Sequence, residues 1–475
     1  MEPGRCVVMY AGFGLGHLTP MVELAKLFVR RGLAVTIAVP TTPRPLPANA
    51  LAGAPTVASL AAANTSISFH LLPPPHYPDP DPTPFVRMLD MLRLCTPSLR
   101  ELLRSLPSVA ALVVDAFCAH AVDVAAELRV PAYVYCTSSA SAFASFLHLP
   151  YYLSKTGNSL GDMGKEELLH FPGLPPIPAS DMPSTLRNRE DRDYKVRAEL
   201  YARVAEASGM LVNTFEWLEA RAVKALREGA CAPDRRMPPV YCVGPLVAAD
   251  ASVEADQSER HACLAWLDAQ PDRSVVFLCF GSLGSVSAPQ LNEIARGLES
   301  SGHRFLWVLR SPPDSKKFFE PRSEPDLAEK LVPDGFLERT RGRGLVVPSW
   351  APQVEVLRHK ATGAFVTHCG WNSTLEGVAA GVPLLCWPQF AEQSLNKVLI
   401  VEEMKVGVVV EGYDEEIVVC AEEVEAKVRL VMESEEGERL RERLTLAKEK
   451  AEEVLMDGGP SRLAFDEFLK DLAEF

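Results

Sequence analysis

The sequence lacks the features that would draw a protein to nucleic acids, acidic membranes or metal ions. Among its 475 residues, 48 are Lys or Arg and 62 are Asp or Glu, so the formal net charge is −14, and no block rich in Lys or Arg stands out. Nucleic acids and anionic membranes attract basic surfaces that replace their counterions, so neither is expected as a partner. No His, Cys or carboxylate cluster has the spacing of metal ligands, since His359 and His368 are too far apart for an H-x-x-x-H pair. Small molecules are therefore the expected ligands, without a metal.

The sequence also lacks an export signal, a long apolar run and paired cysteines. Its first residues have neither the basic start nor the apolar core of a secretory signal. The longest apolar stretches, such as residues 109–122, are interrupted by Asp115 and His120 and are shorter than the ~20 residues that cross a bilayer. The 11 cysteines stand mostly singly in apolar runs without C-x-x-C spacing, which indicates reduced thiols. We expect a monomeric cytoplasmic protein with no membrane span.

What the sequence does contain is two series of segments in which short apolar runs, typical of strands, alternate with patterns typical of helices. This βαβ rhythm predicts two α/β domains, each with a parallel sheet covered by helices on both faces. In the first series, strands are predicted at residues 5–10, 34–39, 111–115 and 132–136, with a helix over residues 20–31. In the second series, strands are predicted at residues 274–280, 304–309, 344–349, 364–368, 384–387 and 408–411, with a helix over residues 374–380.

A polar segment without periodicity separates the two series. Residues 244–260 are rich in small and charged side chains, so we predict that they form the interdomain linker. The N-terminal domain is then expected over residues 1–243 and the C-terminal domain over residues 261–455. Residues 310–330 carry prolines and mixed charges and are predicted to form a long surface loop.

A glycine turn after the first strand presents a histidine. The turn nearly matches the dinucleotide fingerprint G-x-G-x-x-G, but His17 replaces the last glycine and the second strand ends without an acidic residue, so NAD is not expected. We instead expect His17 at a helix N-terminus on the carboxyl edge of the sheet. Asp115 closes the strand over residues 111–115 and shares that edge if the two strands are neighbours. Asp115 either accepts the Nδ1 proton of His17 and fixes its tautomer, or caps the helix that starts near Cys118.

A second constellation spans residues 350–393. Its centre reads as strand, glycine turn and helix, so residues 369–373 are expected to point backbone N–H groups and a positive helix end above the sheet, an arrangement that binds phosphate. Trp350 offers a flat surface on which a nucleobase stacks. Ser373 and Glu376 match a capping box, so Glu376 either holds the helix start or contacts the ligand.

These residues resemble the plant secondary product glycosyltransferase box, with its W-A-P-Q, H-C-G-W-N-S, E-G and E-Q positions. With the glycine–histidine turn and the Phe280-Gly-Ser turn, the resemblance to the plant UDP-sugar-dependent glycosyltransferases of family 1 extends over the whole chain. It implies the GT-B fold, in which two Rossmann-like doubly wound α/β domains face each other across a cleft and residues 456–475 form a C-terminal helix that packs back on the N-terminal domain. It also implies a phenolic acceptor and a UDP-sugar as partners, with no cofactor beyond the co-substrate.

The same resemblance implies a role for each site residue. His17 is the general base and Asp115 its orienting partner. The donor residues follow the UDP-sugar from base to sugar: Trp350, Ala351 and Gln353 at the uracil and ribose, Glu376 at the ribose hydroxyls, His368, Asn372, Ser373 and Ser282 at the diphosphate, and Trp371, Glu392 and Gln393 at the sugar. Gln at the last box position implies UDP-glucose.

The expected reaction is an inverting transfer of glucose to a hydroxyl group, and the base favours one acceptor class. An imidazole of pKa near 6.5 faces a phenol of pKa near 10, a gap of about 3.5 pKa units or ~5 kcal/mol, and an aliphatic alcohol is harder still. We therefore expect a flavonoid or phenylpropanoid acceptor. Its pocket is predicted to include Phe13 and Phe117, with further contributions from residues 76–85, 136–152 and 181–200. Glucosylation of a ring carbon and a non-catalytic UDP-sugar sensor are the alternatives.

Overall fold

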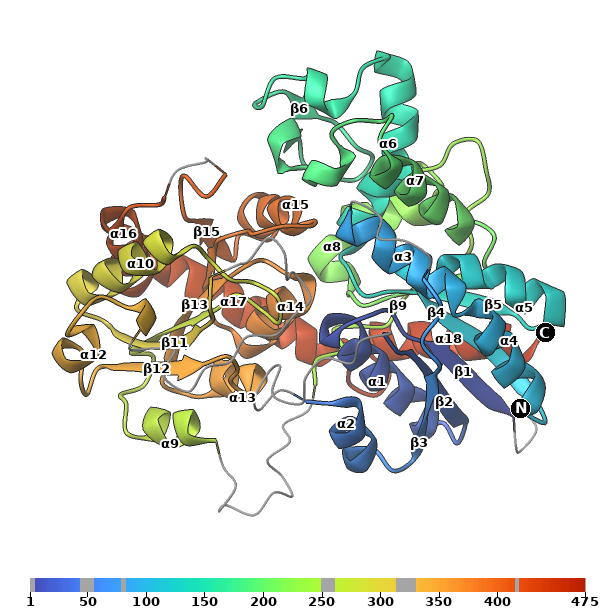
Figure 1. Ribbon diagram of the computed structural model, residues 1–475, viewed down its shortest axis with the longest axis horizontal. Helices are drawn as coiled ribbons and strands as arrows, with labels where there is room; N and C mark the ends of the chain where they lie inside the picture. Colours follow the sequence, from blue (N-terminus) through green and yellow to red (C-terminus); the bar gives the residue numbers. More distant parts are fainter. Residues whose placement is uncertain are drawn as a thin grey trace. The chain divides into compact units, whose positions relative to one another are not determined.

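The computed structural model describes residues 5–42, 55–77, 83–248, 261–312, 330–414 and 418–474, and the chain divides into two compact units (Figure 1). Among the described residues, the first unit holds those up to Leu246 and those from Glu452 onward, and the second unit holds the rest. Most of the predicted linker, residues 249–260, lies outside the described part of the chain, as do residues 313–329 of the predicted loop.

The first unit is built on a seven-stranded sheet in which every pairing is parallel, in the order β3-β2-β1-β4-β5-β8-β9. The four strands predicted for this part of the chain are confirmed, and β1 and β4 are neighbours. Continuous apolar runs form these strands because helices cover both faces of the sheet (Figure 1). The strands are β1 (Cys6–Tyr10), β2 (Ala34–Pro40), β3 (Ile67–Leu72), β4 (Val109–Asp115), β5 (Ala132–Cys136), β8 (Gly209–Val212) and β9 (Val240–Cys242).

The helices of the first unit include one from the far end of the sequence. Phe468 of α18 lies 5.8 Å from the ring of Phe28 on α1 and 4.8 Å from that of Tyr133 on β5, measured between ring centroids. The last helix is therefore part of the core of the first unit. The helices are α1 (Leu15–Arg30), α2 (Val57–Ala63), α3 (Pro84–Leu94), α4 (Thr96–Ser105), α5 (Val122–Leu128), α6 (Ala140–Thr156), α7 (Arg192–Val204), α8 (Glu216–Arg227) and α18 (Pro460–Ala473), with a short 3₁₀ helix η1 (Ala116–Ala121) after β4.

The second unit repeats the design with six parallel strands in the order β12-β11-β10-β13-β14-β15. All six predicted strands are confirmed: β10 (Val275–Cys279), β11 (Arg304–Leu309), β12 (Gly344–Pro348), β13 (Thr362–Thr367), β14 (Leu384–Cys386) and β15 (Gly407–Val409). The main helices are α9 (Ala262–Asp268), α10 (Ala288–Ser301), α12 (Phe336–Arg339), α13 (Gln353–Arg358), α14 (Trp371–Ala380), α15 (Gln393–Val398), η7 (Leu399–Met404), α16 (Ala421–Glu433) and α17 (Glu435–Glu453).

Two helix starts were predicted too late. Helix α1 begins at Leu15 rather than residue 20, because Gly14 adopts a φ of 89° and caps it, while Pro20 is accommodated inside the helix near its start. Helix α14 begins at Trp371 rather than residue 374, with Gly370 as its N-cap. His17 and residues 371–373 therefore lie in the first turns of helices and not in the loops before them.

The structure describes the state of the cysteines and the apolar character of the helices. All 11 cysteines are free thiols, and only Cys420 is exposed. Among the residues that the structure describes, no helix is both long and apolar enough to cross a bilayer.

Candidate active site

In the first unit, a histidine and an aspartate meet at the carboxyl ends of adjacent strands. His17 follows β1 and Asp115 ends β4, and Nδ1 of His17 lies 2.8 Å from Oδ2 of Asp115. The aspartate side chain is fully buried, whereas that of the histidine is 22% exposed. A carboxylate only accepts hydrogen bonds, so Nδ1 carries the proton and Nε2 is the basic nitrogen.

Asp115 performs both of the roles that the sequence left open. Its second oxygen, Oδ1, accepts a hydrogen bond of 2.9 Å from the backbone N–H of Phe117 and so caps η1. This cap fixes the carboxylate while Oδ2 orients the imidazole. Thr137, which follows the next strand, β5, places Oγ1 3.2 Å from Nδ1 of His17, a contact that the sequence analysis did not predict.

The glycine turn allows this close approach. A Cβ atom at Gly12 would lie 3.0 Å from Oδ1 of Asp115 and 3.1 Å from Cγ of His17. A side chain at Gly12 would therefore require the histidine or the aspartate to shift by a few tenths of an ångström.

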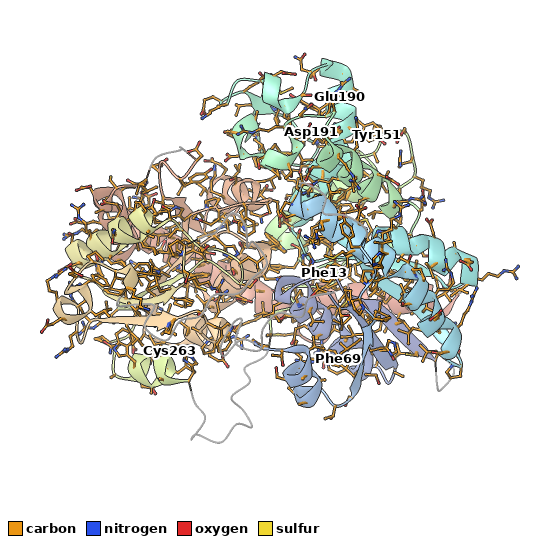
Figure 2. The ribbon with its side chains drawn as sticks, viewed as in Figure 1. Phe13, Phe69, Tyr151, Glu190, Asp191 and Cys263 are labelled. Carbon is orange, nitrogen blue, oxygen red and sulfur yellow. The ribbon has the colours of Figure 1, made fainter. Side chains whose placement is uncertain are left out.

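One aromatic side chain lies beside the ring of His17, and a second contacts the first. The ring of Phe117 lies 4.8 Å from the His17 ring, and Phe85 on α3 lies 5.9 Å from Phe117 in an edge-to-face arrangement. Phe13 lies in the loop between β1 and α1 and is partly exposed (Figure 2). Of the other predicted acceptor segments, residues 136–152 lead into α6 and residues 181–200 into α7, whereas residues 78–82 lie outside the described residues.

In the second unit, the predicted donor residues gather at the carboxyl edge of the other sheet. Ser282 follows β10, Trp350 follows β12 and His368 follows β13, while Glu392 caps α15 after β14. Trp350 is partly exposed, and its ring meets that of His261 edge-on at 5.8 Å. The other side chains differ in exposure: Ala351, Trp371, Ser373 and Gln393 are buried, and Asn372 is partly exposed.

Glu376 is not part of a capping box. Helix α14 is capped by Gly370, so Ser373 already lies inside its first turn, and that alternative is wrong. Instead Gln353 donates from Nε2 to Oγ of Ser373 at 2.8 Å and to Oε2 of Glu376 at 2.6 Å. Burial raises the pKa of Glu376 to about 7. These three side chains form a connected polar group between α13 and α14.

His368 is enclosed by two glycine turns. A Cβ atom at Gly281 would lie 2.5 Å from the His368 ring, and one at Gly370 would lie 2.4 Å from it. Burial, with a smaller contribution from the positive charge of Arg310, lowers the pKa of His368 to about 4. His368 is therefore neutral near pH 7 and has one N–H to donate.

Arg310 is a residue that the sequence analysis missed. It directly follows β11, and its Nε donates to the backbone oxygen of Ser349 at 2.9 Å. Its Nη1 is buried and has no hydrogen-bond partner among the described residues, and burial lowers the pKa of the guanidinium. We expected this residue to begin a surface loop, but it is held at the sheet edge beside His368. Its position in the sequence could have identified it as a site residue, because Arg310 comes at the end of an apolar strand, as Asp115 does in the first unit.

Three residues of this region have positive φ angles, which residues other than glycine rarely adopt. Ser349, Cys369 and Ala391 have φ values of 65°, 63° and 57°. Asn396 stabilises one of them by donating from Nδ2 to the backbone oxygen of Cys369 at 3.0 Å. Such conformations are frequent at functional sites, and these three, half of the six non-glycine residues with positive φ among the described residues, follow β12, β13 and β14.

The side-chain amide oxygen of Gln393 already accepts hydrogen bonds within the protein. Its Oε1 accepts hydrogen bonds from the backbone N–H groups of Gln389, at 2.8 Å, and Phe390, at 3.0 Å. The amide oxygen therefore stabilises the turn before α15, and the NH₂ group is the end left for a ligand. Within the described residues, no group of three or more His, Cys, Asp or Glu side chains is placed to hold a metal ion.

Comparison with known proteins identifies the family. Residues 236–436 match the family model described as "UDP-glucoronosyl and UDP-glucosyl transferase". The chain is 42% identical over 472 residues to anthocyanidin 5,3-O-glucosyltransferase of a Rosa hybrid cultivar, covering 96% of this chain and 97% of that protein. It is 40% identical over 481 residues to phloretin 2'-O-glucosyltransferase of Malus domestica, with the same coverage.

A solved structure extends the similarity to three dimensions. Phytolacca americana UGT2, complexed with UDP-2fluoro-glucose and pterostilbene, matches with a TM-score of 0.83 and 36% identity, over 99% of this chain and 100% of that one. The two parallel sheets with their helices are the two Rossmann-like units of the GT-B fold. Similarity of this extent over nearly the whole chain shows that the protein belongs to the plant family 1 UDP-dependent glycosyltransferases.

Proposed function

We propose that this protein transfers glucose from UDP-glucose to a hydroxyl group of a phenolic acceptor, giving a β-glucoside and UDP. The observation that carries the proposal is the hydrogen bond between His17 and the buried Asp115, which makes Nε2 the basic nitrogen of a partly exposed histidine beside the ring of Phe117. A UDP-sugar sensor without catalysis has no use for such a base.

The chemistry follows from the tautomer of His17. The acceptor hydroxyl gives its proton to Nε2 while its oxygen forms a bond to the anomeric carbon of glucose. On the opposite face of that carbon, the bond to the diphosphate oxygen breaks, and its electron pair leaves with UDP. The configuration at the anomeric carbon is therefore inverted. Asp115 stabilises the imidazolium that forms.

For the donor, we propose that the second unit holds UDP-glucose through the residues at its sheet edge. Trp350 stacks on the uracil, next to Ala351. Gln353 and Glu376 bind the ribose, supported by their mutual hydrogen bond. Ser282, His368, Asn372 and Ser373 give neutral donors to the diphosphate, and Trp371, Glu392 and the NH₂ group of Gln393 bind the glucose. To these we add Arg310, whose buried guanidinium places a positive charge beside His368. Such a preorganised charge stabilises the leaving diphosphate.

A phenolic acceptor is supported by chemistry and by similarity. A phenol is about 3.5 pKa units from a normal imidazole, a gap that a positioned base can bridge. The similar proteins from Rosa and Malus are named for anthocyanidin and phloretin, and the Phytolacca enzyme was solved with pterostilbene. We propose that Phe13 and Phe117 contact an acceptor of this kind.

The test is release of UDP from UDP-glucose with and without a panel of flavonoids and phenylpropanoids, with products mapped by mass spectrometry. We expect acceptor-dependent release, an acid-labile O-glucoside and a turnover lower by about 10²-fold or more in His17→Ala. An acid-stable product would indicate transfer to ring carbon, and UDP-glucose binding without turnover of any phenol would indicate a sensor.

We also propose a monomer located in the cytoplasm. Ten buried free thiols suit a reducing compartment. Gel filtration of the purified chain and fractionation of cells that express it test the two statements.

A further inference from the structure

Helix α7 carries two charged side chains on its buried face. The buried residues of α7 are Asp193, Arg197, Leu200, Tyr201 and Val204, which repeat at helical spacing. Asp193 and Arg197 are each only 6% exposed, although this stripe is where apolar residues belong. Charged side chains are rarely buried to this degree without a partner, so each calls for an explanation.

Arg197 has no polar partner within the described part of the chain. Its guanidinium has neither a hydrogen bond nor an ion pair there, and Nε is buried and unpaired. Asp193 lies one helical turn away, yet no nitrogen of Arg197 comes within 4.0 Å of its carboxylate, and its Oδ1 is also buried without a partner. A buried N–H without an acceptor loses its hydrogen bond to water, and the Nη atoms also have no acceptor among the described residues, so this side chain is suited to receive an acceptor from a ligand.

Two aromatic rings hold the guanidinium in place. Its Cζ lies 4.0 Å from the ring centre of Phe85 and 5.2 Å from that of Phe146 on α6. Stacking on ring faces stabilises the cation and leaves its N–H edge for acceptors in its own plane. Arg197 also lines a small hollow of about 10 Å³, together with Leu149, Leu186 and Tyr194.

Phe85 connects Arg197 to the proposed base. Phe85 contacts Phe117 at 5.9 Å, and Phe117 contacts His17 at 4.8 Å. The guanidinium is therefore three successive contacts from the imidazole, with only aromatic rings between them.

We propose that Arg197 is an anion-binding residue of the acceptor pocket, and that the protein favours phenolic acceptors that carry a negatively charged oxygen at the end opposite the reacting hydroxyl. This inference rests on the proposed function. The planar fork of the guanidinium pairs with a carboxylate through two parallel hydrogen bonds, so a carboxylate is the simplest probe of the subsite.

The experiment compares acceptors that differ only in charge at the far end. Two pairs of different length are used: 3-(4-hydroxyphenyl)propanoate and 4′-hydroxybiphenyl-4-carboxylate, each against its primary amide, with UDP-glucose as donor. In at least one pair, we expect the wild type to prefer the acid over the amide by about tenfold in kcat/KM, mainly through KM. In Arg197→Gln this preference falls to about one, while turnover of the amide changes by less than about threefold.

Two further variants separate recognition from structure. Arg197→Lys keeps the charge but not the fork, so it is expected to retain part of the preference. Arg203→Gln removes an arginine from the same helix that is paired with Asp123 and Glu206, and it should leave the preference unchanged.

Several results would overturn the proposal. One is a wild-type ratio of acid to amide near or below one in both pairs, and another is an equal ratio in wild type and Arg197→Gln. A third result concerns stability: Arg197→Gln is less stable than the wild type, adding Asp193→Asn restores the stability, and no variant prefers the acid. The guanidinium would then serve only to balance the charge of Asp193. Turnover of the amides reports separately on the proposed function, which fails only if neither amide nor acid is glucosylated.

Discussion

The two units use one architecture to build two different environments for a histidine. In the first unit, His17 follows β1 and Asp115 ends the neighbouring strand, so the imidazole is oriented as a base. In the second unit, His368 follows β13 and lies beside Arg310, so burial and a positive charge keep its pKa at about 4. The residues at the ends of nearby strands differ in charge. A carboxylate accepts from Nδ1 of His17, whereas a guanidinium adds a smaller effect to the burial that lowers the pKa of His368. We propose that the first histidine is a base and the second a neutral donor to an anion.

The largest expected effect separates the two histidines. His17→Ala should lower kcat by about 10²–10⁴-fold and leave the affinity for UDP unchanged, because only the base is lost. His368→Ala should weaken UDP binding, since it removes an N–H from the diphosphate site. Steady-state kinetics with one phenol and calorimetry with UDP measure the two effects. If both variants lost only kcat, or both lost only affinity for UDP, the two histidines would not have different roles.

A change at Asp115 tests how the base is oriented. In Asp115→Asn the amide oxygen still accepts from the Phe117 N–H, but the NH₂ group donates to Nδ1 of His17 and shifts the ring proton to Nε2. We expect kcat to fall by roughly 10²-fold, less than in His17→Ala, with the helical content unchanged. A loss confined to UDP affinity would remove Asp115 from the catalytic pair.

A change at Arg310 tests the charge in the second unit. Arg310→Gln should weaken UDP binding by about tenfold or more, because it removes a charged donor and the bond to Ser349. Arg310→Lys should recover part of the loss. Arg296→Gln on α10, whose arginine pairs with Glu293 at the surface, is the matched control. Removal of the neighbouring charge should also raise the pKa of His368, which NMR measures; an unchanged pKa and unchanged UDP affinity would contradict the role.

The smallest expected effect is a pH dependence from Glu376. Its folded pKa of about 7 lies above the ordinary value of 4.5, so the folded state holds the proton more tightly and stability falls as pH rises from about 4.5 to about 7. Relative to Glu376→Gln, the wild type should lose stability over that window in urea titrations. UDP affinity should rise over the same window in the wild type only, because the ionised carboxylate accepts from the ribose. Parallel curves for the two proteins would contradict this.

Local sequence was sufficient for much of the fold. Apolar runs bounded by glycine and polar residues identified the strands that carry the site, because burial on both faces demands such runs. The glycine turn before His17 was also recognisable, since positive φ values and close approach favour glycine. The helix starts at Leu15 and Trp371 were missed because a glycine cap leaves no side-chain signal.

Contacts between distant residues were not available from sequence. Arg197 looks like an ordinary exposed residue of a charged helix, and only the packing of α7 beside Phe85 and Phe146 reveals its burial. The internal hydrogen bonds of Gln393 and the bond from Arg310 to Ser349 depend in the same way on turns formed by other segments.

The sequence by itself determined ten strands of the two parallel sheets, most of the site residues at their carboxyl edges and the resemblance to a glycosyltransferase family, because these follow from patterns within short segments; it did not indicate β3, β8 and β9. Only the tertiary structure decided that β4 lies next to β1, which brings the negative Asp115 to His17. It also decided that the positive charge of Arg310 lies near His368. The physical reason is that strand order and side-chain pairing arise when segments far apart in the chain pack together, and their energies depend on the burial that this packing creates.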